Sequence, residues 1–86
     1  MAEEELKYPL EWVFRIVAEK DFAGEVRLAV GRIAEKYNVP CDLSDGLVSK
    51  GGSYITVKFA VLVRDREMFA AIGDDLGTIE HVKFVL

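Results

Sequence analysis

The sequence predicts an α+β fold in which one four-stranded antiparallel sheet carries two helices on the same face. Two observations predict it. Apolar residues recur alternately at steps of two and at steps of three or four, in the order βαββαβ. A glycine-bearing turn at residues 49–53 leads directly into a β-branched run at 54–63, as in a hairpin. This order is that of a split βαβ sandwich, whose right-handed crossovers give the strand order 4-1-3-2.

The first strand is predicted from Trp12 to Ala18, where two sets of residues alternate. The set expected in the core contains Trp12, Phe14 and Ile16, and the opposite set contains Val13, Arg15 and Val17. A helix is predicted over residues 22–37, because apolar side chains recur there at steps of three and four. We expect Asp21 to cap this helix and Asn38 to end it in a left-handed conformation.

Two strands follow the first helix. Residues 41–49 contain the sequence Ser44-Asp45-Gly46, which predicts an irregular edge strand with a turn or a bulge. The run at 54–63 alternates more regularly. Its buried set is expected to contain Ile55, Val57, Phe59, Val61 and Val63, and its opposite set Tyr54, Thr56, Lys58, Ala60 and Leu62.

A second helix and a last strand complete the predicted fold. We expect Asp65 to cap this helix and Gly77 to end it. The last strand is predicted over residues 79–86. On strict alternation its core set contains Val82, Phe84 and Leu86, and its opposite set contains His81, Lys83 and Val85.

Length and composition limit the class of protein. A chain of 86 residues forms one domain, predicted at 8–86 behind a flexible N-terminal arm at 1–7. The net charge of −4 argues against nucleic-acid binding through bulk electrostatics. The first residues lack the apolar segment of a signal peptide, and no apolar run approaches the roughly 18 residues of a membrane span. The single cysteine, Cys41, cannot form an internal disulfide, so we expect a cytoplasmic protein without membrane contact.

No motif in the chain predicts catalysis, a metal or a cofactor, and we therefore expect a protein that is not an enzyme. His81 has no cysteine or carboxylate pattern around it that would indicate a metal site. Cys41 has no histidine partner at a spacing typical of a catalytic nucleophile, so we expect Cys41 to be a small buried residue. The segment from Lys50 to Tyr54 partly matches an RNA-recognition signature. Gly52 stands where the first stacking aromatic belongs, however, so RNA binding is not favoured.

The predicted topology leaves one sheet face without a helix, and this face holds the candidate partner- or ligand-binding residues. They are Val13, Arg15, Val17, Tyr54, Lys58, Leu62, Lys83 and Val85. The three cations come from three neighbouring strands and are expected to cluster among the aliphatic side chains. Apolar patches with polar rims commonly mark partner surfaces. The alternative is a plain solvated face on which lysine and arginine stems cover aliphatic neighbours.

Four segments carry a resemblance to a known family. They are Tyr8-Pro9, the strand Trp12–Val17, the turn Ser49-Lys50-Gly51 that leads to Tyr54, and the closing Val82–Leu86. In their order and spacing the chain resembles the YbeD-like family of small bacterial proteins. The resemblance implies a ferredoxin-like fold similar to the regulatory ACT domain. It implies no established activity and supplies no catalytic residues.

Two functions follow from these expectations. The first is a regulatory or protein-interaction domain that docks a partner, or a second copy of the chain, through the open sheet face. The alternative is ACT-like binding of a small anionic metabolite such as an amino acid, in which Arg15 and Lys83 would neutralise the carboxylate. RNA binding is a third reading, which the charge and the missing aromatics disfavour.

Overall fold

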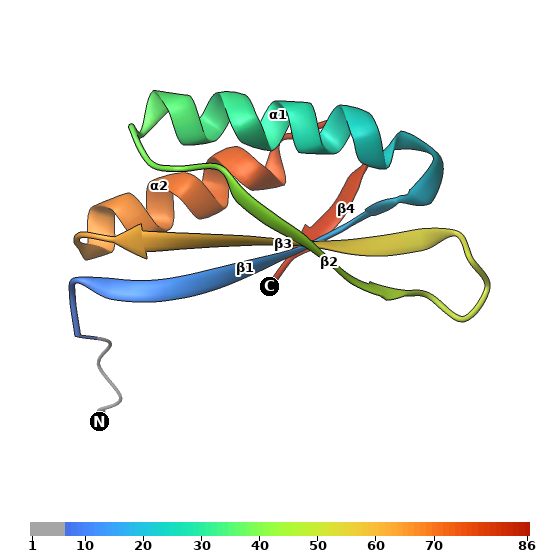
Figure 1. Ribbon diagram of the computed structural model, residues 1–86, viewed down its shortest axis with the longest axis horizontal. Helices are drawn as coiled ribbons and strands as arrows, with labels where there is room; N and C mark the ends of the chain where they lie inside the picture. The colour runs from blue at the N-terminus through green and yellow to red at the C-terminus, as the bar shows by residue number, and fades with distance from the viewer. Residues whose placement is uncertain (1–6) are drawn as a thin grey trace.

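Four strands form one antiparallel sheet, and both helices lie on the same side of it (Figure 1). The computed structural model describes residues 7–86, so the predicted arm lies outside the described residues except for Lys7. The elements in chain order are β1 (Leu10–Glu19), the short 3-10 helix η1 (Lys20–Phe22), α1 (Ala23–Lys36), β2 (Asp42–Val48), β3 (Tyr54–Val63), α2 (Arg66–Gly77) and β4 (Val82–Val85). The spatial order β2-β3-β1-β4 confirms the predicted α+β, ferredoxin-like fold.

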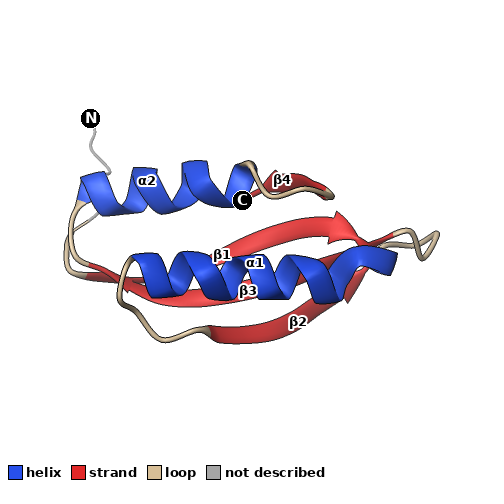
Figure 2. Cartoon of the chain, turned by 90° about the horizontal axis from the view of Figure 1, so that it is seen from above, coloured by secondary structure: helices blue, strands red, loops and turns tan. Residues whose placement is uncertain are grey.

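The two central strands, β1 and β3, pair over their whole length, from Leu10 opposite Val63 to Glu19 opposite Tyr54. Their alternation fixes which side chains face the helices. This buried set contains Phe14, Ile16 and Ala18 from β1, and Val57, Phe59, Val61 and Val63 from β3. Viewed from above, α1 and α2 run along this side of the sheet (Figure 2). The core therefore lies between the helices and one sheet face, and the other face is left without a covering layer.

The helix boundaries confirm some of the predicted signals and correct others. Asp65 caps α2, because its Oδ1 accepts a hydrogen bond of 2.8 Å from the Met68 backbone N–H. Asn38 follows α1 with a φ of 58°, the predicted left-handed conformation. The prediction for Asp21 is wrong: this residue lies inside η1, and α1 begins after Phe22 without a side-chain cap. The prediction that Gly77 ends α2 is also imprecise, because Gly77 is the last residue of the helix and Thr78 is its C-cap.

The last strand shows the main departure from the predicted pattern. On β1, Val17 pairs with Phe84 but Ala18 pairs with Val82, so Lys83 is an extra residue in a β-bulge. Val82 and Val85 therefore both pack toward the core, whereas Phe84 is exposed. The prediction that Val85 lies on the open face is wrong, as is the prediction that Phe84 and Leu86 enter the core. Strict alternation cannot anticipate a bulge, which shifts every later side chain by one position.

Two single residues also differ from expectation. His81 precedes β4 with a φ of 73°, and its ring stacks on Phe22 with centroids 3.6 Å apart. Cys41 is exposed rather than buried. Neither helix in residues 7–86 has the length and apolar character that crossing a membrane requires.

Candidate functional site

The sheet face opposite the helices is the candidate site, and it is called the open face below. Its position follows from the pairing register, because directly opposed residues of neighbouring strands point to the same side. The open face contains Glu11, Val13, Arg15, Val17 and Glu19 from β1, Tyr54, Thr56, Lys58, Ala60 and Leu62 from β3, Asp42 and Ser44 from β2, and Phe84 from β4. In Figure 1 this face points away from both helices.

Large apolar side chains on this face are exposed to solvent. Leu62 is 52% exposed, Phe84 is 49% exposed and Val13 is 38% exposed. Leu86 is exposed as well, and its backbone exchanges two hydrogen bonds with that of Arg15. The bulge in β4 thus adds Phe84 and Leu86 to the open face in place of Val85. A local sequence pattern contains no signal for this exchange, because the bulge depends on how β4 pairs with β1.

Six of the predicted site residues lie on the open face, but the three cations do not form one cluster; the six are Val13, Arg15, Val17, Tyr54, Lys58 and Leu62. Arg15 and Lys58 are direct Cα partners across β1 and β3. Lys83 lies elsewhere, with its Nζ 5.6 Å from the centroid of the Tyr54 ring. Tyr54 is four positions from Lys58 on the same strand, which corresponds to about 13 Å. Lys83 therefore makes a cation–π contact at one end of the face, and the central charge comes from Arg15 and Lys58.

The Arg15–Lys58 pair is unfavourable within the isolated fold. Like charges directly opposite each other on neighbouring strands destabilise a sheet. No carboxylate in residues 7–86 forms an ion pair with either side chain. The centre of the open face is therefore locally cationic on a chain whose net charge is −4.

A hollow of about 400 Å³ adjoins this pair on the side of β2, and we call it the Gly46 hollow. Its lining residues are Arg15, Asp45, Gly46, Leu47, Thr56 and Lys58. It forms at a second bulge, because three steps from Asp45 to Val48 on β2 face only two steps on β3. The bulge leaves Leu47 85% exposed at the rim. The sequence Ser44-Asp45-Gly46 predicts a turn or bulge here. It does not predict that the bulge forms a hollow beside Arg15 and Lys58.

Glycine suits position 46 because two side chains of β3 approach it closely. A Cβ atom there would lie 3.1 Å from both Cβ and Cγ2 of Thr56, and 3.3 Å from Cε of Lys58. The Lys58 stem thus lies beside the glycine backbone, which leaves its ammonium group near the hollow. The Asp45 carboxylate accepts a hydrogen bond from Arg27 of α1, so its charge is already paired. Arg15 and Lys58 therefore dominate the electrostatics of the hollow.

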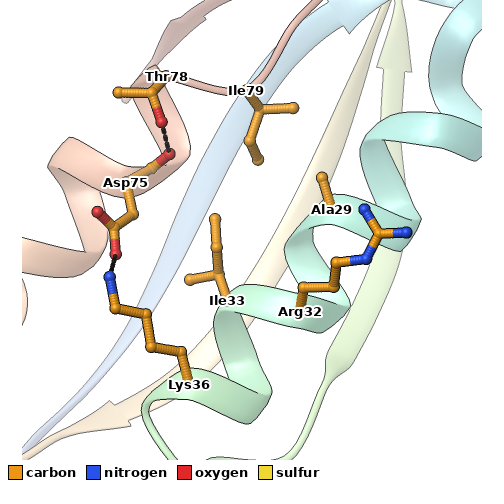
Figure 3. Close-up of a pocket in the computed structure, with 7 residues that line it drawn as sticks. All are labelled: Ala29, Arg32, Ile33, Lys36, Asp75, Thr78 and Ile79. Carbon is orange, nitrogen blue, oxygen red and sulfur yellow. Dashed lines mark hydrogen bonds and ion pairs between the residues drawn. The ribbon is translucent and has the colours of Figure 1, made fainter.

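A second concave region lies between the two helices, on the opposite side of the molecule (Figure 3). Its volume is about 360 Å³. Ala29, Ile33 and Ile79 line its apolar part, and Arg32, Lys36, Asp75 and Thr78 its polar part. Asp75 Oδ2 accepts hydrogen bonds from Lys36 Nζ at 2.9 Å and from the Tyr37 hydroxyl at 2.7 Å. Lys36, Asp75 and Tyr37 are called the Asp75 network.

The electrostatics of the Asp75 network are those of a structural contact between α1 and α2. The hydrogen bonds from Tyr37 and then Lys36 lower the pKa of Asp75 below its ordinary value. The hydrogen bond from Tyr37 to Asp75 raises the pKa of Tyr37, and the separate hydrogen bond from Lys36 to Asp75 is the main cause of the raised pKa of Lys36. The three polar groups satisfy one another, and Arg32 is the further charged side chain that lines this region. Within residues 7–86, no group of three histidine, cysteine or acidic side chains is placed to hold a metal ion.

Comparison with known proteins establishes the family and agrees with the fold. The family described as "Protein of unknown function (DUF493)" matches residues 3–86, which confirms the resemblance to YbeD-like proteins. No curated protein sequence matches the chain.

Three solved structures share the fold. Protein HP0495 from H. pylori aligns with a TM-score of 0.80 and 19% identity, over 98% of this chain and 88% of that one. The C-terminal domain of the MgtC protein from Mycobacterium tuberculosis aligns with a TM-score of 0.71 and 13% identity, over 95% and 89%. The ACT domain from GTP pyrophosphokinase of Chlorobium tepidum aligns with a TM-score of 0.64 and 15% identity, over 90% and 95%. At these identities the alignments establish the architecture alone.

Proposed function

This chain belongs to the DUF493 family of proteins of unknown function, and we propose that it is a regulatory interaction domain that docks a protein partner through its open face. The proposal is non-catalytic: it needs an exposed surface of defined charge and no reacting group. It also suits the architecture, because one sheet face has no covering layer while the other carries both helices.

The observation that carries the proposal is the Arg15–Lys58 pair among exposed apolar side chains. A cross-strand pair of cations costs stability in the free protein, and an acidic group on a partner would remove that cost. Val13, Leu62 and Phe84 supply apolar area around the pair. Burying a side chain of this kind contributes about 1.5–3 kcal/mol, which must offset the cost of association.

A different protein suits this face better than a second copy of the chain. If two open faces met at their centres, four cations would be brought together, and like-charge contact of this kind costs several kcal/mol. A partner with acidic and aliphatic side chains has the opposite character. The cationic centre also orients an acidic partner as it approaches, because the rest of the chain carries a net negative charge.

Three features disfavour nucleic acid as the partner. The Tyr54 ring, which is the aromatic ring of β3 on the open face, already has the Lys83 ammonium against it. β1 contributes no aromatic side chain to this face, and Phe84 of β4 offers one exposed ring, whereas single-strand binders stack successive bases on several such rings. A net charge of −4 further opposes a polyanion.

The Gly46 hollow supports a second candidate function, the binding of a small anionic metabolite. It has the volume of a small-molecule site and two adjacent cations. A thermal-shift screen of carboxylate metabolites tests this candidate, because a ligand at 100 times its dissociation constant adds about 2.7 kcal/mol to the stability. A screen without any shift argues against it and leaves the docking proposal unchanged.

The docking proposal is tested by co-purification from native cells with Leu62→Asp and a matched control, Leu28→Asp. Leu62 lies on the open face, whereas Leu28 lies on α1 and is 66% exposed. We expect Leu62→Asp to lose a partner that Leu28→Asp retains. Light scattering on the same proteins reports the mass in solution. A homodimer sensitive to Leu62→Asp would show that a second copy occupies the face, and equal recovery by both variants contradicts the proposal.

A further inference from the structure

We infer that the Gly46 hollow receives a single carboxylate side chain of the partner, from a segment in which acidic and aliphatic residues are neighbours. The inference rests on the proposed function, because it names the chemistry of the group that docks on the open face. It concerns a defined part of that face, on the β2 side of the Arg15–Lys58 pair.

The donors around the hollow match one carboxylate. Arg15 presents a planar guanidinium that can bind both oxygens of a carboxylate, and Lys58 presents an ammonium from the neighbouring strand. Thr56 adds a hydroxyl group, which makes no side-chain hydrogen bond within residues 7–86. These three side chains have no anionic partner of their own in the described part of the chain.

The glycine makes this arrangement possible. A Cβ atom at position 46 would lie 3.1 Å from Thr56 and 3.3 Å from Cε of Lys58, so a larger residue would push against two of the side chains that line the hollow. The bulge at the same place turns Leu47 outward, where it can contact an aliphatic neighbour of the bound carboxylate. The hollow therefore offers polar donors on β1 and β3 and an apolar rim on β2.

The acidic residue beside the hollow limits how much negative charge can enter. Asp45 lines the hollow, and its charge is compensated by Arg27 from the helix side. A singly charged carboxylate can interact with both Arg15 and Lys58 while bringing only one negative charge near Asp45. A phosphate group would bring about two negative charges close to that carboxylate. The arrangement thus favours aspartate or glutamate over a phosphorylated residue.

The experiment is an amide-shift NMR titration with two capped pentapeptides, acetyl-Leu-Glu-Leu-Glu-Leu-amide and its counterpart with glutamine at both glutamate positions. Free glutarate is a third probe, which supplies the carboxylate without a peptide. The protein variants are Thr56→Val and Lys58→Met, with Lys50→Met as the control. Lys50 lies in the exposed hairpin turn, so its variant has the same net charge as Lys58→Met but an unchanged hollow.

We expect the glutamate peptide to shift the amides of Arg15, Thr56 and Lys58, and to bind Lys58→Met at least tenfold more weakly than Lys50→Met. Thr56→Val should weaken binding by a smaller factor, and the glutamine peptide should bind at least tenfold more weakly than the glutamate peptide. Failure of the glutamate peptide to bind, equal binding of both peptides, or glutarate binding as tightly as the peptide would each overturn the inference.

The same variants separate this inference from the proposed function. If a partner recovered from cells is lost with Leu62→Asp but retained with Lys58→Met, the open face docks a protein and the carboxylate inference is wrong. If the partner is lost with Lys58→Met and retained with Lys50→Met, both stand.

Discussion

Arg15 and Lys58 face each other directly across the two central strands of the sheet, and no carboxylate in residues 7–86 forms an ion pair with either of them. The free protein thus keeps an electrostatically unfavourable contact in the middle of its uncovered surface. A contact of this kind is typical of surfaces kept for binding rather than for stability.

Reversing one charge of the pair should stabilise the protein. Arg15→Glu places a carboxylate opposite Lys58, and an opposite-charge cross-strand pair contributes roughly 0.2–1 kcal/mol. Urea denaturation at low salt measures the gain, and Lys50→Glu in the hairpin turn is the control with a comparable change in charge. The gain should shrink near 1 M salt, where the screening length is about 3 Å. A loss of stability in Arg15→Glu would show that the two cations do not repel in the native state.

The N-cap of α2 provides a test of the local structure. Asp65→Ala should lower the free energy of unfolding by about 1 kcal/mol, because the Met68 N–H loses its acceptor. Asp21→Ala is the control, since Asp21 lies in η1 and caps no helix. Chemical denaturation of both variants checks the prediction, and an equal loss in the two would contradict the assignment of the caps.

The close approach at the β2 bulge predicts a cost for a very small substitution. Gly46→Ala should destabilise the protein by about 1–3 kcal/mol, the usual cost of overpacking, because its Cβ would lie 3.1 Å from Thr56. Gly51→Ala in the adjacent turn is the matched control, since nothing lies within 4 Å of its Cβ. Thermal melts of the two variants should therefore separate, and coincident melts would rule out the close contact at Gly46.

The Asp75 network predicts a pH-dependent contribution to stability. The folded pKa of Asp75 is lowered, so its contribution is present above the ordinary carboxyl pKa of about 4 and is lost as the pH falls through the folded value. The pKa of Tyr37 is raised, so its contribution is present below about pH 10 and is lost as the pH rises through its folded pKa.

Tyr37→Phe tests this dependence. At neutral pH it should cost about 0.5–1.5 kcal/mol, the usual net value of a hydrogen bond. The difference from wild type should shrink as Asp75 becomes protonated. Tyr54→Phe is the control, because the Tyr54 hydroxyl makes no hydrogen bond within the described residues. Urea denaturation between pH 3 and 9 measures both variants, and a constant difference for Tyr37→Phe would exclude the linkage.

The sequence predicts the elements of this fold where the information is local. The alternation on β1 and β3, together with the strand order, also predicts that Arg15 and Lys58 share one face. The Asp65 cap and the left-handed Asn38 are likewise readable, because each depends on a few neighbouring residues.

The departures arise where one element depends on a distant one. The bulge at Lys83 is set by pairing with β1, and it moves Val85 into the core and Phe84 onto the open face. The contact between Tyr37 and Asp75 joins residues 38 positions apart, which no periodicity reveals. The Gly46 hollow needs both the bulge in β2 and its register with β3. The composition of the candidate site was therefore only partly predictable.

The most direct test of the open face as a docking surface is site-specific photo-crosslinking in native cells. A benzophenone amino acid at Ala60 lies near the centre of that face, and the same probe at Leu28 lies on the helix side. We expect a protein adduct from position 60 and none of the same mass from position 28. Adducts from position 28 alone, or no adduct from position 60, would contradict it.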